Sequence, residues 1–158
     1  MIVLRESVLV VGVVTVGLMA GLYSAFSYAV MPALRRVDDK TFVAAIQRIN
    51  VAIVNPLFLL IFFGGIGFTV VAAVLYRDQP ELWWIVAGAV LYGVTLVITV
   101  VFNVPLNNQI AAAGDPDRIS DLHAVREAFE DSWVRWNIVR AVASTAALAV
   151  LAAGLVTR

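Results

Sequence analysis

The sequence predicts an all-α integral membrane protein, a four-helix transmembrane bundle that forms a single domain over residues 1–158. Hydrophobic residues make up 62% of the chain and charged residues 14%, whereas soluble domains are roughly one-quarter charged. Four uncharged apolar runs each approach or exceed the roughly 20 helical residues that cross a bilayer core. Runs of this length suit helices better than the tilted strands of a membrane barrel, which need only about 10 residues.

The four predicted spans are residues 7–31, 51–76, 82–102 and 137–157. The first run exceeds the 7 to 15 apolar residues of a signal peptide, so we interpret it as a span. The fourth run reaches full length only by including Arg140 near its start. This predicts a positive charge near one end of the membrane-spanning segment.

The two long connections are also predicted to contain helix. Asp38 or Asp39 can cap a helix with an apolar stripe, which we expect to run into the second span with a kink at Pro56. Asp115 and Pro116 have the residue types of a second helix start. We therefore predict an amphipathic cytoplasmic helix between the third and fourth spans, at the membrane interface or merged with the fourth span.

The positive charges predict the orientation in the membrane. Eight Lys and Arg residues lie in the two long connections, and three lie at the other ends of the spans. Because the more positive side faces the cytoplasm, the charges predict a multi-pass protein of the cell membrane with both termini outside the cytoplasm. Membrane lipid is the expected surrounding, and no nucleic-acid partner is predicted.

Small residues four apart occur in several spans. They are Gly17 and Gly21, Ala89 and Gly93, and a stripe from Ala141 to Ala153. Such spacings let helices approach closely in lipid. We interpret them as packing within the bundle, and a homo-oligomer seam is the alternative.

Polar residues inside or beside the spans gather at the predicted cytoplasmic end. Helical spacing groups them into three stripes: Trp133, Trp136, Asn137, Arg140 and Ser144; Tyr92, Thr95, Thr99 and Asn103; Gly17, Gly21, Ser24 and Tyr28. We expect these faces to meet inside the bundle and to widen into a polar chamber toward the cytoplasm.

Two interpretations of these residues stay open. An Arg at the centre of a membrane helix costs roughly 2.5 to 3.5 kcal/mol, so it needs a reason. In the structural interpretation, Asn side chains bond carbonyls freed near Pro56 and Pro105, and Arg140 reaches lipid phosphate. In the other interpretation, Arg140 binds a ligand, because no acidic residue lies in any span to pair with it.

The residue types also limit the chemistry. The chain has one His, His123, no Cys, and carboxylates only outside the predicted spans. We therefore predict no metal site and no cofactor. Coupled ion transport is disfavoured for the same reason, since it usually leaves a buried acidic or His relay.

Three segments resemble the anthrone oxygenase-like family. They are Met31-Pro32-Ala33-Leu34, Asn103-Val104-Pro105-Leu106-Asn107, and Trp133-Val134-Arg135-Trp136-Asn137 followed by Arg140. The resemblance covers nearly the whole chain and implies a four-helix membrane fold. Some members oxidise polycyclic anthrones, so it also implies a cofactor-free oxygenase that acts on a hydrophobic aromatic small molecule. The resemblance does not identify a settled set of catalytic residues.

In the oxygenase hypothesis, Arg140, Asn103 and Asn137 are the catalytic candidates, because their donors can hold a developing oxyanion. The ligand-binding candidates are Asn107, Asn108, Trp133, Trp136, Asn55, Tyr28 and Ser24. Both Trp residues also fit an interfacial aromatic belt. The base is Tyr28, His123 or none, if the substrate ionises in the pocket. The alternative function is a non-enzymatic module that binds a lipid, quinone or partner helix through the same pocket.

Overall fold

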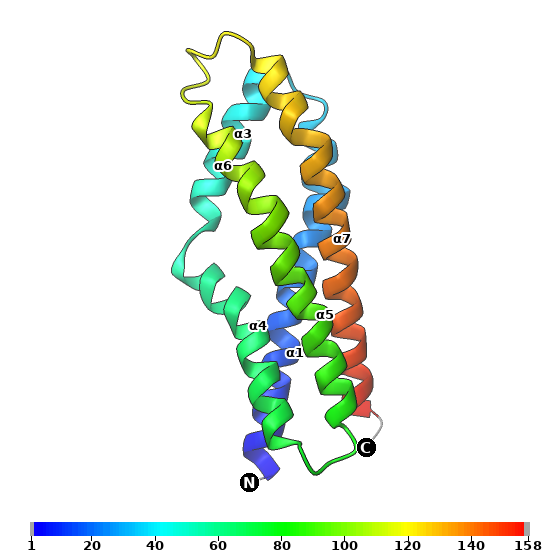
Figure 1. The fold of residues 1–158 in the computed structure, drawn as a ribbon. Coiled ribbons are helices and arrows are strands. Elements are labelled where there is room, and N and C mark those ends of the chain that lie inside the picture. The colour runs from blue at the N-terminus through cyan, green and yellow to red at the C-terminus, as the bar shows by residue number, and fades with distance from the viewer. Residues whose placement is uncertain (1, 157–158) are drawn as a thin grey trace.

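The computed structural model describes residues 2–156, which fold into helices joined by short turns (Figure 1). The elements are α1 (Ile2–Ala25), η1 (Phe26–Val30), α2 (Met31–Leu34), α3 (Asp39–Ile53), α4 (Pro56–Leu75), α5 (Leu82–Ile98), η2 (Thr99–Asn103), α6 (Val104–Ala112) and α7 (Leu122–Val156). The elements η1 and η2 are π-helical. The described residues contain no strand.

Four helical units are long and apolar enough to cross a membrane, which confirms the predicted fold class. They are Ile2–Leu34, Pro56–Leu75, Leu82–Ala112 and Leu122–Val156. The first unit joins α1, η1 and α2, and the third joins α5, η2 and α6. The two ends of the chain lie at the same end of the bundle, as an even number of crossings requires (Figure 1).

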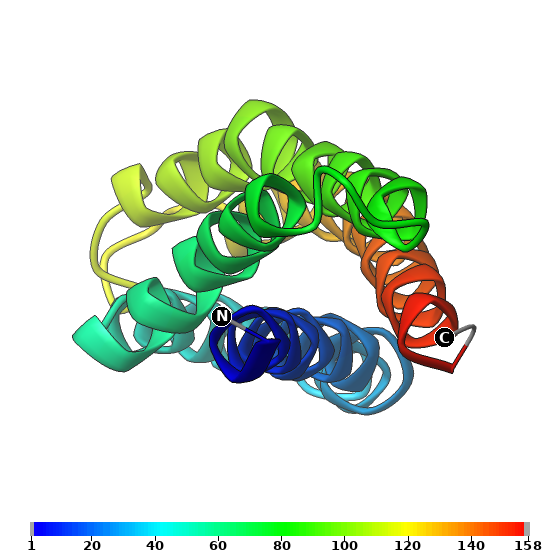
Figure 2. The ribbon, with the colours of Figure 1, turned by 90° about the horizontal axis from the view of Figure 1, so that it is seen from below.

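The lower half of the molecule in Figure 1 is a closed ring of helices. Helix α1 packs against α4 and α7, and α5 packs against α4 and α7 (Figure 2). The buried side chains that these helices share form one apolar core, which includes Leu9, Met19, Tyr92, Ala147 and Leu151. This part has the architecture of a four-helix transmembrane bundle.

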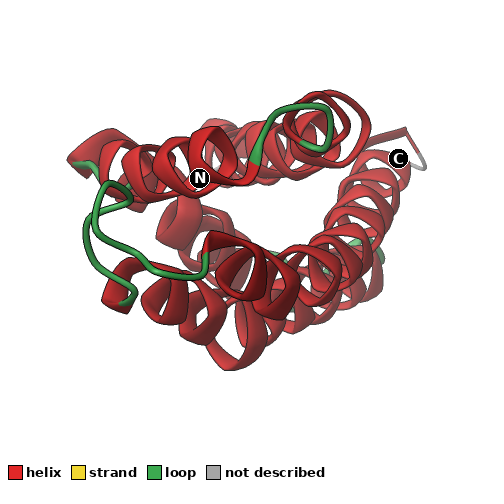
Figure 3. Cartoon of the chain, turned by 90° about the horizontal axis from the view of Figure 1, so that it is seen from above, coloured by secondary structure: helices red, strands yellow, loops and turns green. Residues whose placement is uncertain are grey.

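The upper half contains a second core, built on α3. Its buried members come from four elements and include Met31, Phe42, Ile46, Ile110 and Phe129. Helix α3 covers the ends of the first and third units and the start of α7, and the loops at this end are visible in Figure 3. The apolar stripe predicted for this helix therefore packs against the ends of the long helices.

The Arg126 side chain links the elements that form this second core through hydrogen bonds. Its guanidinium donates to Glu130 Oε2 (2.6 Å), to Asp39 Oδ1 (3.1 Å) and to the Val37 carbonyl (2.9 Å). Glu130 in turn accepts from Arg35 Nε at 2.8 Å. Because these contacts join the end of α2, the start of α3 and α7, they fix how α3 sits on the bundle.

The prediction that α3 continues into the second span is wrong. Helix α3 ends at Ile53, and α4 begins at Pro56 after an extended Asn55. The Asn55 side chain accepts from Phe58 N at 3.0 Å and donates to the Ala52 carbonyl at 3.0 Å. It thus caps both helices, and the second span starts at residue 56 and not at 51.

The predicted helix start at Asp115 and Pro116 is also wrong. Asp115 makes a turn instead, in which its carbonyl accepts from Arg118 N at 2.8 Å. Helix α7 begins at Leu122, where Asp121 Oδ1 caps Ala124 N at 2.9 Å. The amphipathic helix predicted before the fourth span is therefore the first part of α7, continuous with that span.

The two π segments were not predicted, and each lies directly before a proline. At the end of each segment a backbone N–H donates to the carbonyl five residues earlier, Met31 to Phe26 and Val104 to Thr99. The next residue is Pro32 in one case and Pro105 in the other. Widened turns of this kind are rare and often mark functional sites.

Candidate functional site

Arg140 lies in the interior of the bundle on α7, with 8% of its surface exposed. Its Nε and one terminal nitrogen both donate to Asn137 Oδ1, at 3.0 and 2.8 Å. The other terminal nitrogen is 3.4 Å from Thr99 Oγ1 in η2. The guanidinium therefore has a fixed position and does not extend along the surface of the bundle toward lipid phosphate.

Asn137 holds this arrangement in place from one turn earlier on α7. Its Nδ2 donates to the Tyr23 carbonyl at 3.0 Å and to Ser27 Oγ at 2.7 Å. The hydrogen bonds of its amide nitrogen and oxygen thus go to α1, η1 and Arg140. Asn137 therefore ties the first unit to α7 and orients the guanidinium.

No carboxylate balances the charge of Arg140 within residues 2–156. None of the ion pairs in this part of the chain includes it. Its Cζ instead lies 4.2 Å from the ring centroid of Tyr23 and 5.3 Å from that of Trp133. A buried charge without an opposite charge costs several kcal/mol.

A cavity of about 100 Å³ lies against this guanidinium. Its walls come from α1, η1, α3, α4, η2, α6 and α7, and the lining residues are Leu22, Tyr23, Phe26, Ile49, Asn50, Ile53, Val54, Phe58, Phe62, Thr99, Val104, Asn107, Trp133 and Arg140. We call this cavity the aromatic pocket, because five of the lining side chains are aromatic. The predicted polar chamber is thus mostly apolar, with a few polar groups in its wall.

The two π segments and the break between α3 and α4 shape the aromatic pocket. Tyr23 lies in the last turn of α1, Phe26 begins η1, and Thr99 begins η2. Val54 lies in the break itself. Each of the three irregular backbone sites in the long helices therefore contributes to the wall, which explains why regular helical periodicity did not predict it.

Several predicted site residues come together here. Arg140, Asn107 and Trp133 line the aromatic pocket, and Asn137 holds Arg140. Trp133 Nε1 donates to Asn107 Oδ1 at 2.8 Å. Asn103 is fully buried beside them, with its Nδ2 3.4 Å from the Trp133 carbonyl. Asn107 thus fixes the Trp133 ring in the pocket wall, and Asn103 contacts the backbone of the same residue.

Other predicted site residues lie elsewhere. Asn55 caps α4, Asn108 is exposed, and Trp136 stacks on Phe102 with ring centroids 3.5 Å apart. Asn55 lies in the break between α3 and α4, whereas Trp136 belongs to the unbroken helix α7 and has its ring against Phe102 of η2. None of these three lines the aromatic pocket.

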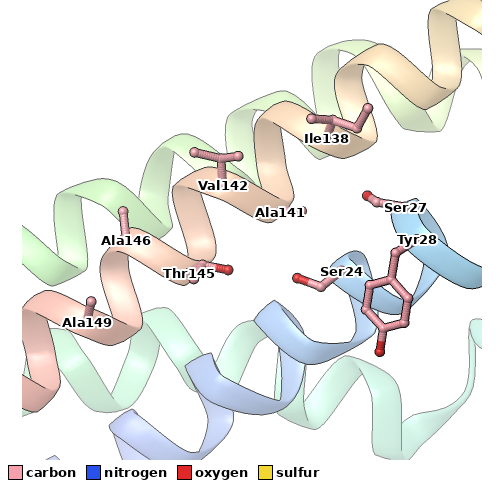
Figure 4. A pocket seen from close by; sticks show the side chains of 9 residues that line it. All are labelled: Ser24, Ser27, Tyr28, Ile138, Ala141, Val142, Thr145, Ala146 and Ala149. Carbon is pink, nitrogen blue, oxygen red and sulfur yellow. The ribbon is translucent and has the colours of Figure 1, made fainter.

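Ser24 and Tyr28 line a different, open groove between the first unit and α7, with a volume of about 530 Å³ (Figure 4). We call it the outer groove. It is lined by Ser24, Ser27, Tyr28, Ile138, Ala141, Val142, Thr145, Ala146 and Ala149. The predicted inner stripe of the first span is wrong, because Gly21 and Tyr28 are exposed and the buried face carries Leu9, Val16, Met19 and Tyr23.

Both named candidates for the base lie outside the aromatic pocket. Tyr28 is 74% exposed beside the outer groove. His123 lies at the far end of α7, where its Nδ1 is 3.3 Å from Asp39 Oδ2 in a charged surface cleft. Sequence reasoning missed Tyr23, Phe26, Asn50, Phe58 and Phe62 as pocket residues.

The fold and this site together define a polytopic helical membrane protein with an enclosed aromatic pocket and a buried, uncompensated cation. The sequence profile described as anthrone oxygenase matches residues 58–150, more than half of the chain. The chain belongs to the anthrone oxygenase family. The match includes the motifs at Asn103 and Trp133 but not Met31–Leu34. Comparison with curated proteins and with solved structures gives no match.

Within residues 2–156 no group of three or more His, Asp and Glu side chains has the arrangement of a metal site. The expectation of cofactor-free chemistry stays a prediction. The groups that the aromatic pocket offers a ligand are a cation, amides, a hydroxyl and aromatic faces. Such groups bind, orient and stabilise charge.

Proposed function

We propose that the protein is a cofactor-independent oxygenase that oxidises a flat, acidic aromatic ketone of the anthrone type with O₂ in the aromatic pocket. The observation that carries the proposal is the buried guanidinium of Arg140, which faces aromatic rings and has no carboxylate partner among the described residues. Family membership supports the substrate class.

The proposed role of the pocket walls is to receive the rings of the substrate. Phe26 and Trp133 lie with ring centroids 5.7 Å apart, and Phe58 stacks on Phe62 at 5.5 Å. Aromatic faces bind flat hydrophobic ligands with defined orientation. In this pose the ketone oxygen of the substrate accepts from Arg140.

Arg140 acts by favouring ionisation of the substrate. A cation within about 4 to 6 Å lowers the pKa of an acid by roughly 1 to 3 units, because it stabilises the anion. An anthrone bound there loses the C–H proton opposite its ketone to water, and Arg140 holds the enolate oxygen. This step needs no base among the protein side chains.

The oxidation balances with O₂ alone. The enolate carbon donates an electron to O₂, and the two radicals combine to form a C–O bond. The peroxide oxygen takes a proton, the remaining hydrogen on that carbon leaves as a proton, and the O–O bond breaks. The products are a quinone and one water, so the substrate loses two hydrogens and gains one oxygen.

Asn137 and Asn103 have supporting roles in this proposal. Asn137 positions Arg140 through two hydrogen bonds, and Asn103 lies behind Trp133. Asn107 orients the same indole through Trp133 Nε1. In this proposal the reaction occurs at the cytoplasmic end of a cell-membrane protein with both termini outside, an orientation that the charge count supports.

The second candidate is a membrane module that binds a quinone or lipid without turnover. The outer groove favours it, because its small and hydroxylated residues form an open, lipid-facing hollow (Figure 4). Oxygen uptake separates the two functions. Purified protein given anthrone should consume O₂ above the rate in detergent alone and release anthraquinone, and ligand retention without O₂ uptake would favour the binding module.

A further inference from the structure

The aromatic pocket contains a second hydrogen-bond donor that the protein does not use. Asn50, in the last turn of α3, lines the pocket together with Ile49, Ile53 and Val54. Its Nδ2 is shielded from solvent and has no partner among the described residues. Buried amides are nearly always paired, so this one calls for an explanation.

The other amides nearby show what normally happens at such positions. Gln47, one turn earlier on α3, donates to the Ile110 and Gly114 carbonyls at 2.9 Å each. Asn55 caps α4, and Asn137 uses Nδ2 for Tyr23 and Ser27. In each case the protein supplies the acceptor. Asn50 differs because its Nδ2 has no acceptor among the described residues and the residue lines the cavity.

We infer that Asn50 is a second ligand-binding residue and that the pocket takes a flat aromatic molecule with two acceptor oxygens, one held by Arg140 and the other by Asn50 Nδ2. The two donors come from different elements, α7 and α3, with the cavity between them. The identity of the oxygen at Arg140 rests on the proposed function, whereas the oxygen at Asn50 rests on the unpaired donor.

This arrangement selects ligands by chemistry as well as by shape. A site built to hydrogen-bond a ligand oxygen rejects an analogue without it strongly, because the donor is then left buried and unpaired. Asn50 therefore disfavours a plain hydrocarbon edge and favours a ring that carries an oxygen at that edge.

Two unreactive probes test the inference, 9,10-anthraquinone and thioxanthone. They share a three-ring outline, but thioxanthone has a ring sulfur, a poor acceptor, in place of the second carbonyl. Neither carries the acidic C–H that the proposed oxidation needs. The wild-type protein in detergent should bind anthraquinone about 10-fold more tightly than thioxanthone.

Asn50→Leu, which keeps the size and removes the donor, should reduce this preference to below about 3-fold. Asn50→Ala serves if the Leu variant does not fold, and Asn108→Leu, at an exposed amide of α6, should keep the preference. Equal binding of both probes by the wild type, or an unchanged preference in the Asn50 variants, would overturn the inference.

Oxygen uptake with anthrone, which has a single oxygen, separates this inference from the proposed function. Asn108→Leu, whose side chain lies outside the pocket, should keep that uptake within about 3-fold. If the wild type takes up no O₂ but distinguishes the probes through Asn50, the oxygenase proposal fails and the binding inference stands. If O₂ uptake occurs without probe discrimination, the inference fails alone.

Discussion

The two halves of the bundle differ in how closely their helices pack. In the half that contains the chain termini, glycines allow helices to pack until side chains touch backbone, and Tyr92 OH donates to the Phe62 carbonyl at 2.8 Å. In the other half, π segments and a helix break separate the helices around the aromatic pocket. There Tyr23, Asn50 and Asn103 each keep a buried polar atom unpaired, and Arg5 and Glu81 do so near the chain termini.

The comparison separates a densely packed half from the half that contains the proposed site. Satisfied contacts and dense packing stabilise the folded bundle, whereas a buried donor without a partner costs roughly 1 to 3 kcal/mol. Sites that keep such a cost are commonly sites where a ligand completes the bonding. The predictions below perturb one half at a time.

The largest effect is expected at Arg140. Arg140→Lys keeps the charge but loses the planar fork that holds Asn137 and a ligand oxygen together, so O₂ uptake with anthrone should fall by about 10²-fold or more. The protein should remain folded and membrane-inserted, as thermal unfolding in detergent would report. Arg140→Ala should lose activity entirely. Full activity in the Lys variant would show that Arg140 has a structural role and not a catalytic one.

The next effect concerns stability in the densely packed half. A Cβ added at Gly65 would lie 2.5 Å from Tyr92 Cε1, so Gly65→Ala should destabilise the bundle by about 1 to 3 kcal/mol through overpacking. Gly67→Ala is the matched control two residues along α4, because nothing lies within 4 Å of its added Cβ. Denaturation in mixed micelles measures both, and equal stability of the two variants would contradict the packing argument.

A smaller change is expected for the hydroxyl of Tyr92. Tyr92→Phe removes the donor to the Phe62 carbonyl and should cost about 1 kcal/mol of stability, with the backbone unchanged. The same unfolding measurement reports the loss of stability, and O₂ uptake shows whether the proposed site in the other half is also affected. Tyr28→Phe, at an exposed Tyr of the outer groove, should change stability by less than about 0.5 kcal/mol.

The mildest test leaves both halves intact and asks which one faces the cytoplasm. Asp117→Cys lies in the exposed connection before α7, and the parent chain has no cysteine. The charge count predicts that this thiol is protected from an impermeant maleimide in intact cells and reacts after permeabilisation. Reaction in intact cells would reverse the proposed orientation.

The membrane fold could be predicted from the sequence because length and apolar composition determine a span almost alone. Phe62, Tyr92 and Leu151 need only be apolar enough to stay in lipid for the four spans to appear. Which residues pack against one another was harder to predict from the sequence. Gly17 and Gly21 have the expected spacing, yet Gly21 has nothing within 4 Å, whereas Gly88 lies against Leu151 and Gly154 against Trp84.

The site could be predicted only where the helices stay regular. Asn137, Arg140 and Ser144 share a buried face of α7 because that helix has no break. Tyr23 was missed although it lies on the regular part of α1 with Val16 and Met19, because the prediction followed the small and polar residues of another face. Asn50 was missed because α3 was expected to continue into the second span but ends at Ile53. A proline that follows an apolar run, as at Pro32 and Pro105, was the available signal, but a proline alone does not distinguish a kink from a π turn.

The short second span also determines how deep the aromatic pocket lies. Helix α4 has 20 residues, and at 1.5 Å per residue it is about 30 Å long, the thickness of a hydrocarbon core. If α4 crosses this core without tilt, its first residue lies at the boundary with the headgroups, and Phe58 and Phe62 lie about 3 and 9 Å below it. Amphipathic aromatic molecules concentrate at this boundary. A substrate would then reach Arg140 by diffusing within the plane of the bilayer, and the rate would follow its mole fraction in the lipid instead of its concentration in water.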